Sequence, residues 1–275
     1  MMLISGFLFF IFSLNHKKVY NEIKNVVSPT YNKFMPRQLT KLVNDEIYHI
    51  VIRAVGDSMI FKNEDDYYRG IFCIYEFNNT DSVQIWRRRR DRITEKKFEK
   101  SVVSPTYNKL PVDKRDKMVE VLAFCFMSNH IHLLVKQLKE GGISRFMKKV
   151  GGGYANYFNK KYDRKGHLFN QFRAIHIKTD EQLWNVFVYI HANPISIIES
   201  GWKENGIKNP EKVTGFLENY KWSSYRDYIG KENFKSVTQR DFILDVLGKE
   251  VGCRQVLEDW IKYRKIKDFG DIVLE

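Results

Sequence analysis

The pattern of apolar and polar positions predicts a mixed chain of strands and helices. Four apolar runs of strand length, rich in β-branched and aromatic residues, predict strands over residues 48–54, 119–126, 130–135 and 172–178. Apolar residues at helical spacing predict helices over 63–77, 143–162 and from 181 until Pro194 ends the last one, with Thr179 or Asp180 as its cap. Gly151–Gly153 falls inside the second helix and predicts a kink, a break or a close approach of DNA backbone.

The order of these elements is β-α-β-β-α-β followed by a helix, which is the ferredoxin-like arrangement. The predicted fold class is therefore α+β: an antiparallel sheet with helices on one face and the other face left for a ligand. Residues 238–247 and 254–265 predict two more amphipathic helices. We expect the fold to occupy residues 35–230, with a basic insertion over about 78–117 and a C-terminal helical appendage over 231–275.

Two histidines stand two residues apart in the third predicted strand. Side chains at i and i+2 of a strand share one face, so His130 and His132 can hold one metal ion while Ile131 points into the core. Downstream, Tyr189 and Asn193 are four apart on one helix face. The amide oxygen of Asn193 can be a third metal ligand, and the phenol of Tyr189 can be a nucleophile.

A simpler interpretation of each residue stays open at this point. A histidine pair on a strand is often only a hydrogen-bonded feature, Tyr189 can pack in the core, and Asn193 can cap the helix before Pro194. The other histidines have structural interpretations. His49 and His176 lie in predicted strands, and we interpret both as satisfied core or edge groups.

Six motifs, taken together, resemble one protein family. They are Met-Ser-Asn-His-Ile-His-Leu-Leu-Val and the segments at 143–147, 157–162, 166–169, 189–194 and 222–228, in that order. The chain is similar to single-tyrosine HUH transposases, and most of all to the REP-associated tyrosine transposases of the IS200-like family. The resemblance implies an RRM-like HUH fold in which Tyr189 is the nucleophile and Asn193 joins His130 and His132 at the metal. The glycine triplet departs from the family pattern.

The resemblance also implies a reaction and its partners. We expect Mg²⁺ or Mn²⁺ at the metal site, attack of Tyr189 on a DNA phosphate to give a 5′-phosphotyrosine, and single-stranded DNA flanked by a hairpin as substrate. A domesticated hairpin-binding protein that does not cleave and a metal-dependent nuclease that uses water are the alternatives. Whether the protein works as a monomer or as a homodimer stays open. The family implies a bacterial or archaeal cytoplasm, near the nucleoid.

Charge supports a nucleic-acid partner. The chain has 46 Lys and Arg against 33 Asp and Glu, a net charge of +13, and its basic residues are interleaved with aromatic ones. The side chains that we expect to contact DNA are all cations: Arg87, Arg88, Arg89, Arg90, Lys148, Lys149, Lys160, Lys161, Arg173 and Lys178. Of these, Lys178 and Arg173 are also candidates to activate Tyr189.

Cysteine usage and the N-terminus change the picture little. Cys73, Cys125 and Cys253 are scattered and odd in number, which argues for a reducing compartment.

Residues 1–14 are apolar but too short to span a bilayer, so we expect no stable membrane partner. An octapeptide repeats word for word at 26–33 and 102–109. We interpret residues 1–34 as an extension or a misplaced start.

Overall fold

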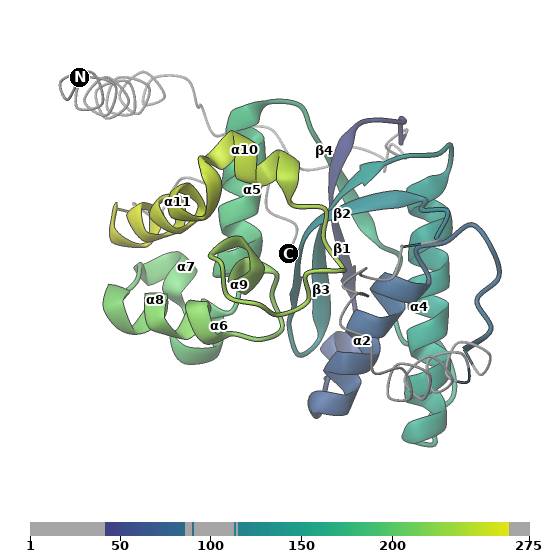
Figure 1. The fold of residues 1–275 in the computed structure, drawn as a ribbon. Coiled ribbons are helices and arrows are strands. Elements are labelled where there is room, and N and C mark those ends of the chain that lie inside the picture. The colour runs from purple at the N-terminus through teal and green to yellow at the C-terminus, as the bar shows by residue number, and fades with distance from the viewer. Residues whose placement is uncertain (1–41, 86–89, 91–112, 114, 264–275) are drawn as a thin grey trace, which may run out of the picture. The chain divides into compact units, whose positions relative to one another are not determined.

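A four-stranded antiparallel sheet forms the centre of the fold in a computed structural model, which describes residues 42–85, 90, 113 and 115–263 (Figure 1). The strands are β1 (Ile47–Arg53), β2 (Val119–Phe126), β3 (His130–Gln137) and β4 (Arg173–Ile177), in the spatial order β2-β3-β1-β4. This is the ferredoxin-like order, so the predicted fold class is confirmed. The predicted extension 1–34, both octapeptides and Arg87–Arg89 lie outside the described residues.

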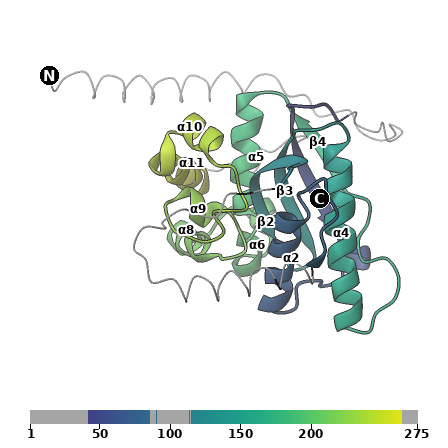
Figure 2. The ribbon, with the colours of Figure 1, turned by 45° about the vertical axis from the view of Figure 1, so that its right-hand side comes forward.

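Helices α2 (Glu64–Glu76) and α4 (Gly142–Lys161) cover one face of the sheet (Figure 2). Helix α2 begins where the Asn63 side chain accepts a hydrogen bond from the Asp66 backbone N–H, as expected of an N-cap. Strand residues such as Ile50, Ile52 and Leu133 point to this side and form one apolar core with both helices.

The second face of the sheet also carries helices, which corrects the expectation of helices on one face only. It packs against α5 (Asp180–Ala192), with Leu134 and Ile177 of the sheet in the same core as Phe187 of the helix. The later helices continue this layer: α6 (Ile195–Ile198), α7 (Trp202–Asn205), α8 (Pro210–Asn219), α9 (Tyr225–Tyr228), α10 (Asp241–Leu247) and α11 (Lys249–Tyr263).

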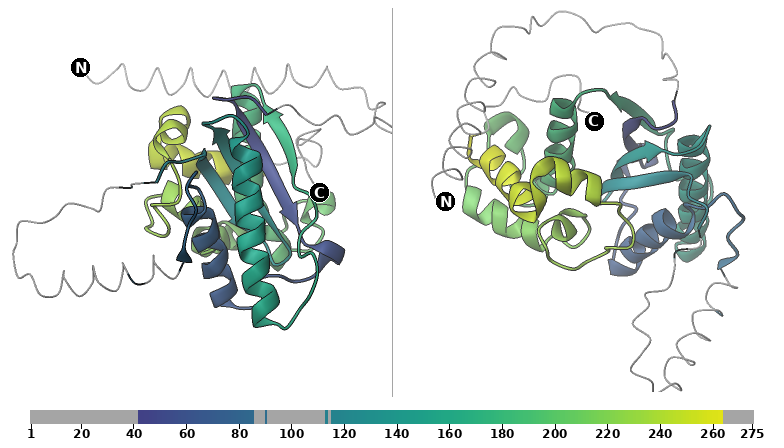
Figure 3. Two further views of the ribbon diagram at one scale, coloured as in Figure 1. Left: turned by 90° about the vertical axis from the view of Figure 1, so that its right-hand side faces the viewer. Right: turned by 45° about the horizontal axis from the view of Figure 1, so that its top comes forward.

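The predicted C-terminal appendage packs on the domain. Leu257 and Ile261 of α11 are buried in the same apolar cluster as α5. Figure 3 shows α10 and α11 on the α5 side of the sheet, away from α4. None of the helices in the described part of the chain is long and apolar enough to cross a membrane.

The glycine triplet does not interrupt α4, which runs unbroken from Gly142 to Lys161. A Cβ atom on Gly153 would overlap the ring of Phe77, whereas one on Gly152 would meet nothing within 4 Å. Gly153 is therefore the residue that lets α4 approach the end of α2. The expected break is therefore wrong, and the close neighbour that the structure shows at the triplet is Phe77 of the chain itself. A close approach of DNA backbone stays a prediction.

We predict opposite effects for alanine at these two glycines. Gly153→Ala forces the Phe77 ring to move and should lower the free energy of unfolding by about 1–3 kcal/mol. Gly152→Ala removes the flexibility of an open helix position and should raise it by up to about 1 kcal/mol. Urea denaturation of both variants and the wild type tests this; an equal effect at the two sites would contradict it.

Candidate functional site

The two histidines of β3 point to the α5 side of the sheet. His132 is buried and His130 is partly exposed, and their ring centroids are 4.8 Å apart. Ile131, between them, is buried on the opposite face in the core with α2 and α4. The predicted alternation of side chains between the two faces of this strand is therefore confirmed.

In both imidazoles, Nδ1 already has a partner. Nδ1 of His132 lies 3.0 Å from Nε2 of His49, and Nδ1 of His130 lies 2.6 Å from Oδ1 of Asn129. Nε2 of His132 is buried and has no hydrogen-bond partner among the described residues. A buried nitrogen without a partner is costly in a folded protein unless a ligand meets it.

Helix α5 brings Tyr189 to the histidines. The Thr179 side chain caps the start of the helix, and Asn193 ends it one turn after Tyr189. The buried ring of Tyr189 lies 5.5 Å from the ring of His132 and 5.8 Å from that of His49. Tyr189 is thus buried, as the core interpretation expects, but it is buried beside His132 and His49.

Asn193 is oriented by its own helix. Its Nδ2 donates to the carbonyl oxygen of Tyr189 at 2.8 Å, and its backbone N–H donates to the same oxygen. Because the amide nitrogen has this partner, Oδ1 is the atom that Asn193 can offer to a ligand.

The atom types of the three predicted ligands are ones that divalent cations bind. Two imidazole Nε2 atoms and one amide oxygen bind Mn²⁺ or Mg²⁺ more weakly than carboxylates do. Three protein ligands leave other coordination positions of the cation for phosphate oxygens. No group of three or more His, Cys, Asp and Glu side chains in the described part of the chain is placed to hold a metal. A metal held by His130 and His132 therefore needs a third ligand of another type, and Asn193 is the candidate.

Burial keeps the pair in the neutral form that binds metals. Burial, followed by the positive charges of Arg53 and Lys203, lowers the pKa of His130 to about 3. Burial also holds the pKa of His132 well below its usual range, with further contributions from His130 and His49. Both rings are therefore uncharged at neutral pH.

Three residues near the site were not predicted to belong to it. His49, interpreted as a satisfied core group, is hydrogen-bonded to His132. Arg53 pairs with His130 across the β1–β3 ladder. Lys203 of α7 lies with its Nζ 5.3 Å from the centroid of the Tyr189 ring. The alternation of side chains along β1 places His49 on the face opposite Ile50, which is the face of the histidine pair. No pattern in the sequence points to Lys203.

Two further histidines, His176 and His191, have structural partners. His176 stacks on Tyr48 and bonds to Glu46 at the surface. His191 is buried, with Nε2 2.9 Å from Oγ of Ser224, and burial lowers its pKa to about 3. His191 thus joins α5 to the segment before α9 and takes no part in the cluster at Tyr189.

The predicted DNA-contacting cations are spread over different surfaces. Lys148, Lys149, Lys160 and Lys161 lie on α4, which covers the face of the sheet opposite the histidines. Lys149 donates to backbone carbonyls of residues 79–81, and Lys161 pairs with the buried Asp66. Lys149 and Lys161 thus have structural roles. Lys148, Lys160 and Arg90 are exposed, and so is Lys161.

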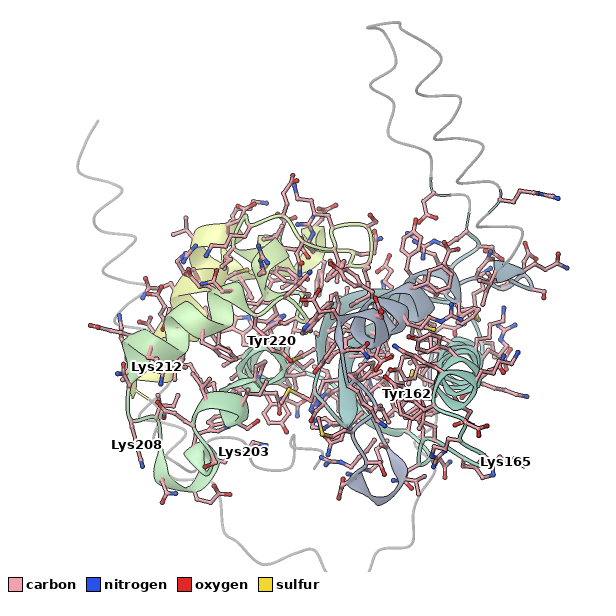
Figure 4. The ribbon with its side chains drawn as sticks, turned by 90° about the horizontal axis from the view of Figure 1, so that it is seen from below. Tyr162, Lys165, Lys203, Lys208, Lys212 and Tyr220 are labelled. Carbon is pink, nitrogen blue, oxygen red and sulfur yellow. The ribbon has the colours of Figure 1, made fainter. Side chains whose placement is uncertain are left out.

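The two candidate activators of Tyr189 lie at opposite ends of β4. Arg173 is exposed. In the sheet it lies opposite Val51 of β1, which on its other side lies opposite His132 of β3. Lys178 is the residue after the other end of β4, so the whole length of the strand, at a rise of about 3.3 Å per residue, separates it from Arg173. Seen from below in Figure 4, Lys203 is the labelled lysine of the α7–α8 segment nearest the sheet, with Lys208 and Lys212 farther out.

Part of the chain matches a known family. Residues 78–193 match the family model described as "Transposase IS200 like", and this range contains His130, His132, Tyr189 and Asn193. It ends before Lys203 and begins after His49. No curated protein matches the chain.

Two solved structures resemble the chain with low sequence identity and low TM-scores. A REP-associated tyrosine transposase bound to a REP hairpin has 12% identity and a TM-score of 0.40, covering 75% of this chain and 90% of that one. A bacterial tRNA(His) guanylyltransferase (Thg1)-like protein in complex with ATP has 12% identity and a TM-score of 0.33, covering 66% and 70%. The family model is the finding that bears on function.

Neighbouring lysines of α4 should differ in their effect on stability. Burial alone would raise the pKa of Asp66, but hydrogen bonds from Lys161, Tyr162 and the Lys62 backbone hold it below its usual value. Lys161→Met leaves this buried carboxylate without its cation and should cost about 1–3 kcal/mol in the free energy of unfolding. The loss should shrink as pH falls through the pKa of Asp66, because the protonated acid does not need Lys161.

The exposed Lys160→Met is the matched control and should change stability by less than about 0.5 kcal/mol. Chemical denaturation of both variants at pH 7 and at a pH below 3.8 measures the difference. Equal stabilities for the two variants at pH 7 would show that the Asp66–Lys161 pair is not structural.

Proposed function

We propose that the protein is a DNA transposase that cleaves and rejoins single-stranded DNA through Tyr189, since residues 78–193 match the family model for IS200-like transposases. The observation that carries this proposal is the placement of the Tyr189 ring 5.5 Å from the ring of His132, which in turn lies 4.8 Å from the ring of His130. Metal binding and nucleophilic attack need such an arrangement at one place.

The reaction follows from the chemistry of these groups. The Oη of Tyr189 loses its proton and forms a bond to the scissile phosphorus, while the bond from phosphorus to the 3′ oxygen breaks. The 3′ oxygen takes up a proton and leaves as a hydroxyl. The DNA is then joined to Tyr189 by a 5′-phosphotyrosine, which conserves the phosphodiester energy and allows rejoining without ATP.

The proposed cofactor is Mg²⁺ or Mn²⁺, held by Nε2 of His130 and His132 and by Oδ1 of Asn193. When bound, the cation would polarise the scissile phosphate and offset the charge that develops on it. The neutral state of both histidines supports this role, because a protonated imidazole cannot bind a metal.

The proposed substrate is single-stranded DNA beside a hairpin. An unpaired strand can bend so that one phosphate reaches the buried Tyr189. The net charge of +13 supports a polyanionic partner. The REP-associated transposase with a similar fold was solved with a REP hairpin, which makes hairpins from the flanks of this gene the first substrates to test.

Covalent adduct formation tests the proposal. Purified protein with Mn²⁺ and single-stranded oligonucleotides from both gene flanks should give a protein–DNA adduct on a denaturing gel. Tyr189→Phe and the double variant His130→Ala/His132→Ala should each abolish it. Cleavage without an adduct that survives Tyr189→Phe would favour a nuclease that uses water. Tight hairpin binding without cleavage would favour a binding protein.

Lys203 should contribute to the same reaction through its charge. It lies over the Tyr189 ring, and its charge contributes to the lowered pKa of both His130 and His132, so it can offset charge on the phosphate under attack. Lys203→Met should slow adduct formation by about 10²-fold, and Lys203→Arg should retain most of the rate. Single-turnover rates with saturating oligonucleotide measure this.

Lys208→Met is the matched control, because Lys208 is an exposed lysine five residues along the chain. It should change the rate by less than about twofold. If Lys203→Met and Lys208→Met have equal rates, Lys203 does not act on the reacting phosphate.

A further inference from the structure

The hydrogen bonds on the far side of the two histidines carry an inference about two residues with no assigned role. We propose that His49 and Asn129 are positioning residues: they hold His130 and His132 in the Nδ1–H tautomer, so that both Nε2 lone pairs face one divalent cation. This rests on the proposed function, because it concerns the metal that the proposed reaction uses.

Asn129 fixes the tautomer of His130. Its Oδ1 can only accept a hydrogen bond, so the Nδ1 of His130, 2.6 Å away, must carry the proton. A neutral imidazole has one N–H, and the lone pair of His130 is therefore on Nε2. Asn129 itself is fixed by the backbone, since its carbonyl oxygen accepts from the N–H of Ala54 at 2.8 Å.

The contact with His49 allows either tautomer of His132 in the absence of metal, and a bound metal selects the one in which His49 accepts the hydrogen bond. Either ring can donate across the 3.0 Å contact between Nε2 of His49 and Nδ1 of His132. A cation on Nε2 of His132 requires the lone pair there, so Nδ1 must then be the donor and His49 the acceptor. Metal-binding histidines in proteins depend on such an acceptor, and its loss costs about 10–100-fold in metal affinity.

The fold holds His49 in this place. In the β1–β3 ladder Val51 pairs with His132 and His49 pairs with Leu134, so the two histidines are diagonal neighbours on one face of the sheet. Their rings stack, with centroids 5.3 Å apart and planes 18° from parallel. His49 is fully buried, which excludes a direct contact with DNA at the surface.

The experiment measures Mn²⁺ affinity rather than cleavage. Titration of the full chain with Mn²⁺, followed by the electron paramagnetic resonance signal of the free ion, should show binding that His130→Ala/His132→Ala abolishes. His49→Leu should weaken it by about 10–100-fold, whereas His49→Gln, which keeps an acceptor, should stay within a few-fold of the wild type. Asn129→Leu should weaken it by a similar factor, and it tests the inference if His49→Leu does not fold.

His176→Leu is the matched control, because His176 is also a strand histidine but bonds to Glu46 away from the pair. It should leave Mn²⁺ affinity unchanged. If the wild type binds Mn²⁺ and His49→Leu and Asn129→Leu bind it as tightly, the inference fails and the proposed function stands. If the wild type binds no Mn²⁺, the proposed metal and this inference both fail.

A spectrum of the unsubstituted protein gives a second readout. Two-bond ¹H–¹⁵N correlations of imidazoles report which nitrogen carries the proton. His130 should be protonated at Nδ1 with or without metal, and His132 should be protonated at Nδ1 once Zn²⁺ or Mg²⁺, as diamagnetic probes, is added. A proton on Nε2 of His130 would overturn the role of Asn129.

Discussion

The antiparallel pairing of β1 with β3 is the constraint on which the site depends. This register sets Arg53 opposite His130 and Val51 opposite His132, and so places His49 diagonally beside His132. A shift of one residue would turn the histidines of one strand into the core with α2 and α4. The apolar residues Ile50, Ile52, Ile131 and Leu133 oppose such a shift because they are buried on that side.

Burial gives this arrangement its chemical character. The same loss of solvent that lowers the pKa of His130 and His132 leaves the Nε2 atom of His132 without a hydrogen-bond partner among the described residues. A cation at this place would recover part of that cost, so metal affinity and the stability of the site are linked. Tyr189 is buried against the rings of His132 and His49, which ties its position to theirs.

Much of this could be predicted from the sequence, because strands and helices follow from local periodicity. The histidine pair, the helix with Tyr189 and the order of the strands needed only the spacing of residues. What local patterns could not show were contacts between distant elements. Gly153 meets Phe77 from another helix, and the second helical layer depends on α5 packing against the sheet.

The same limit explains the residues that were missed at the site. His49 looked like any strand histidine until the β1–β3 register set it against His132, and Lys203 belongs to a short helix without a periodic pattern. Lys149 and Lys161 looked like surface cations but bond to groups of their own protein.

Peptide mapping of the protein–DNA adduct tests the central claim most directly. After the oligonucleotide is digested by nucleases and the protein by trypsin, mass spectrometry should find a nucleotide joined through its 5′ phosphate to Tyr189. A nucleotide attached to any other residue, or through its 3′ phosphate, would contradict the account.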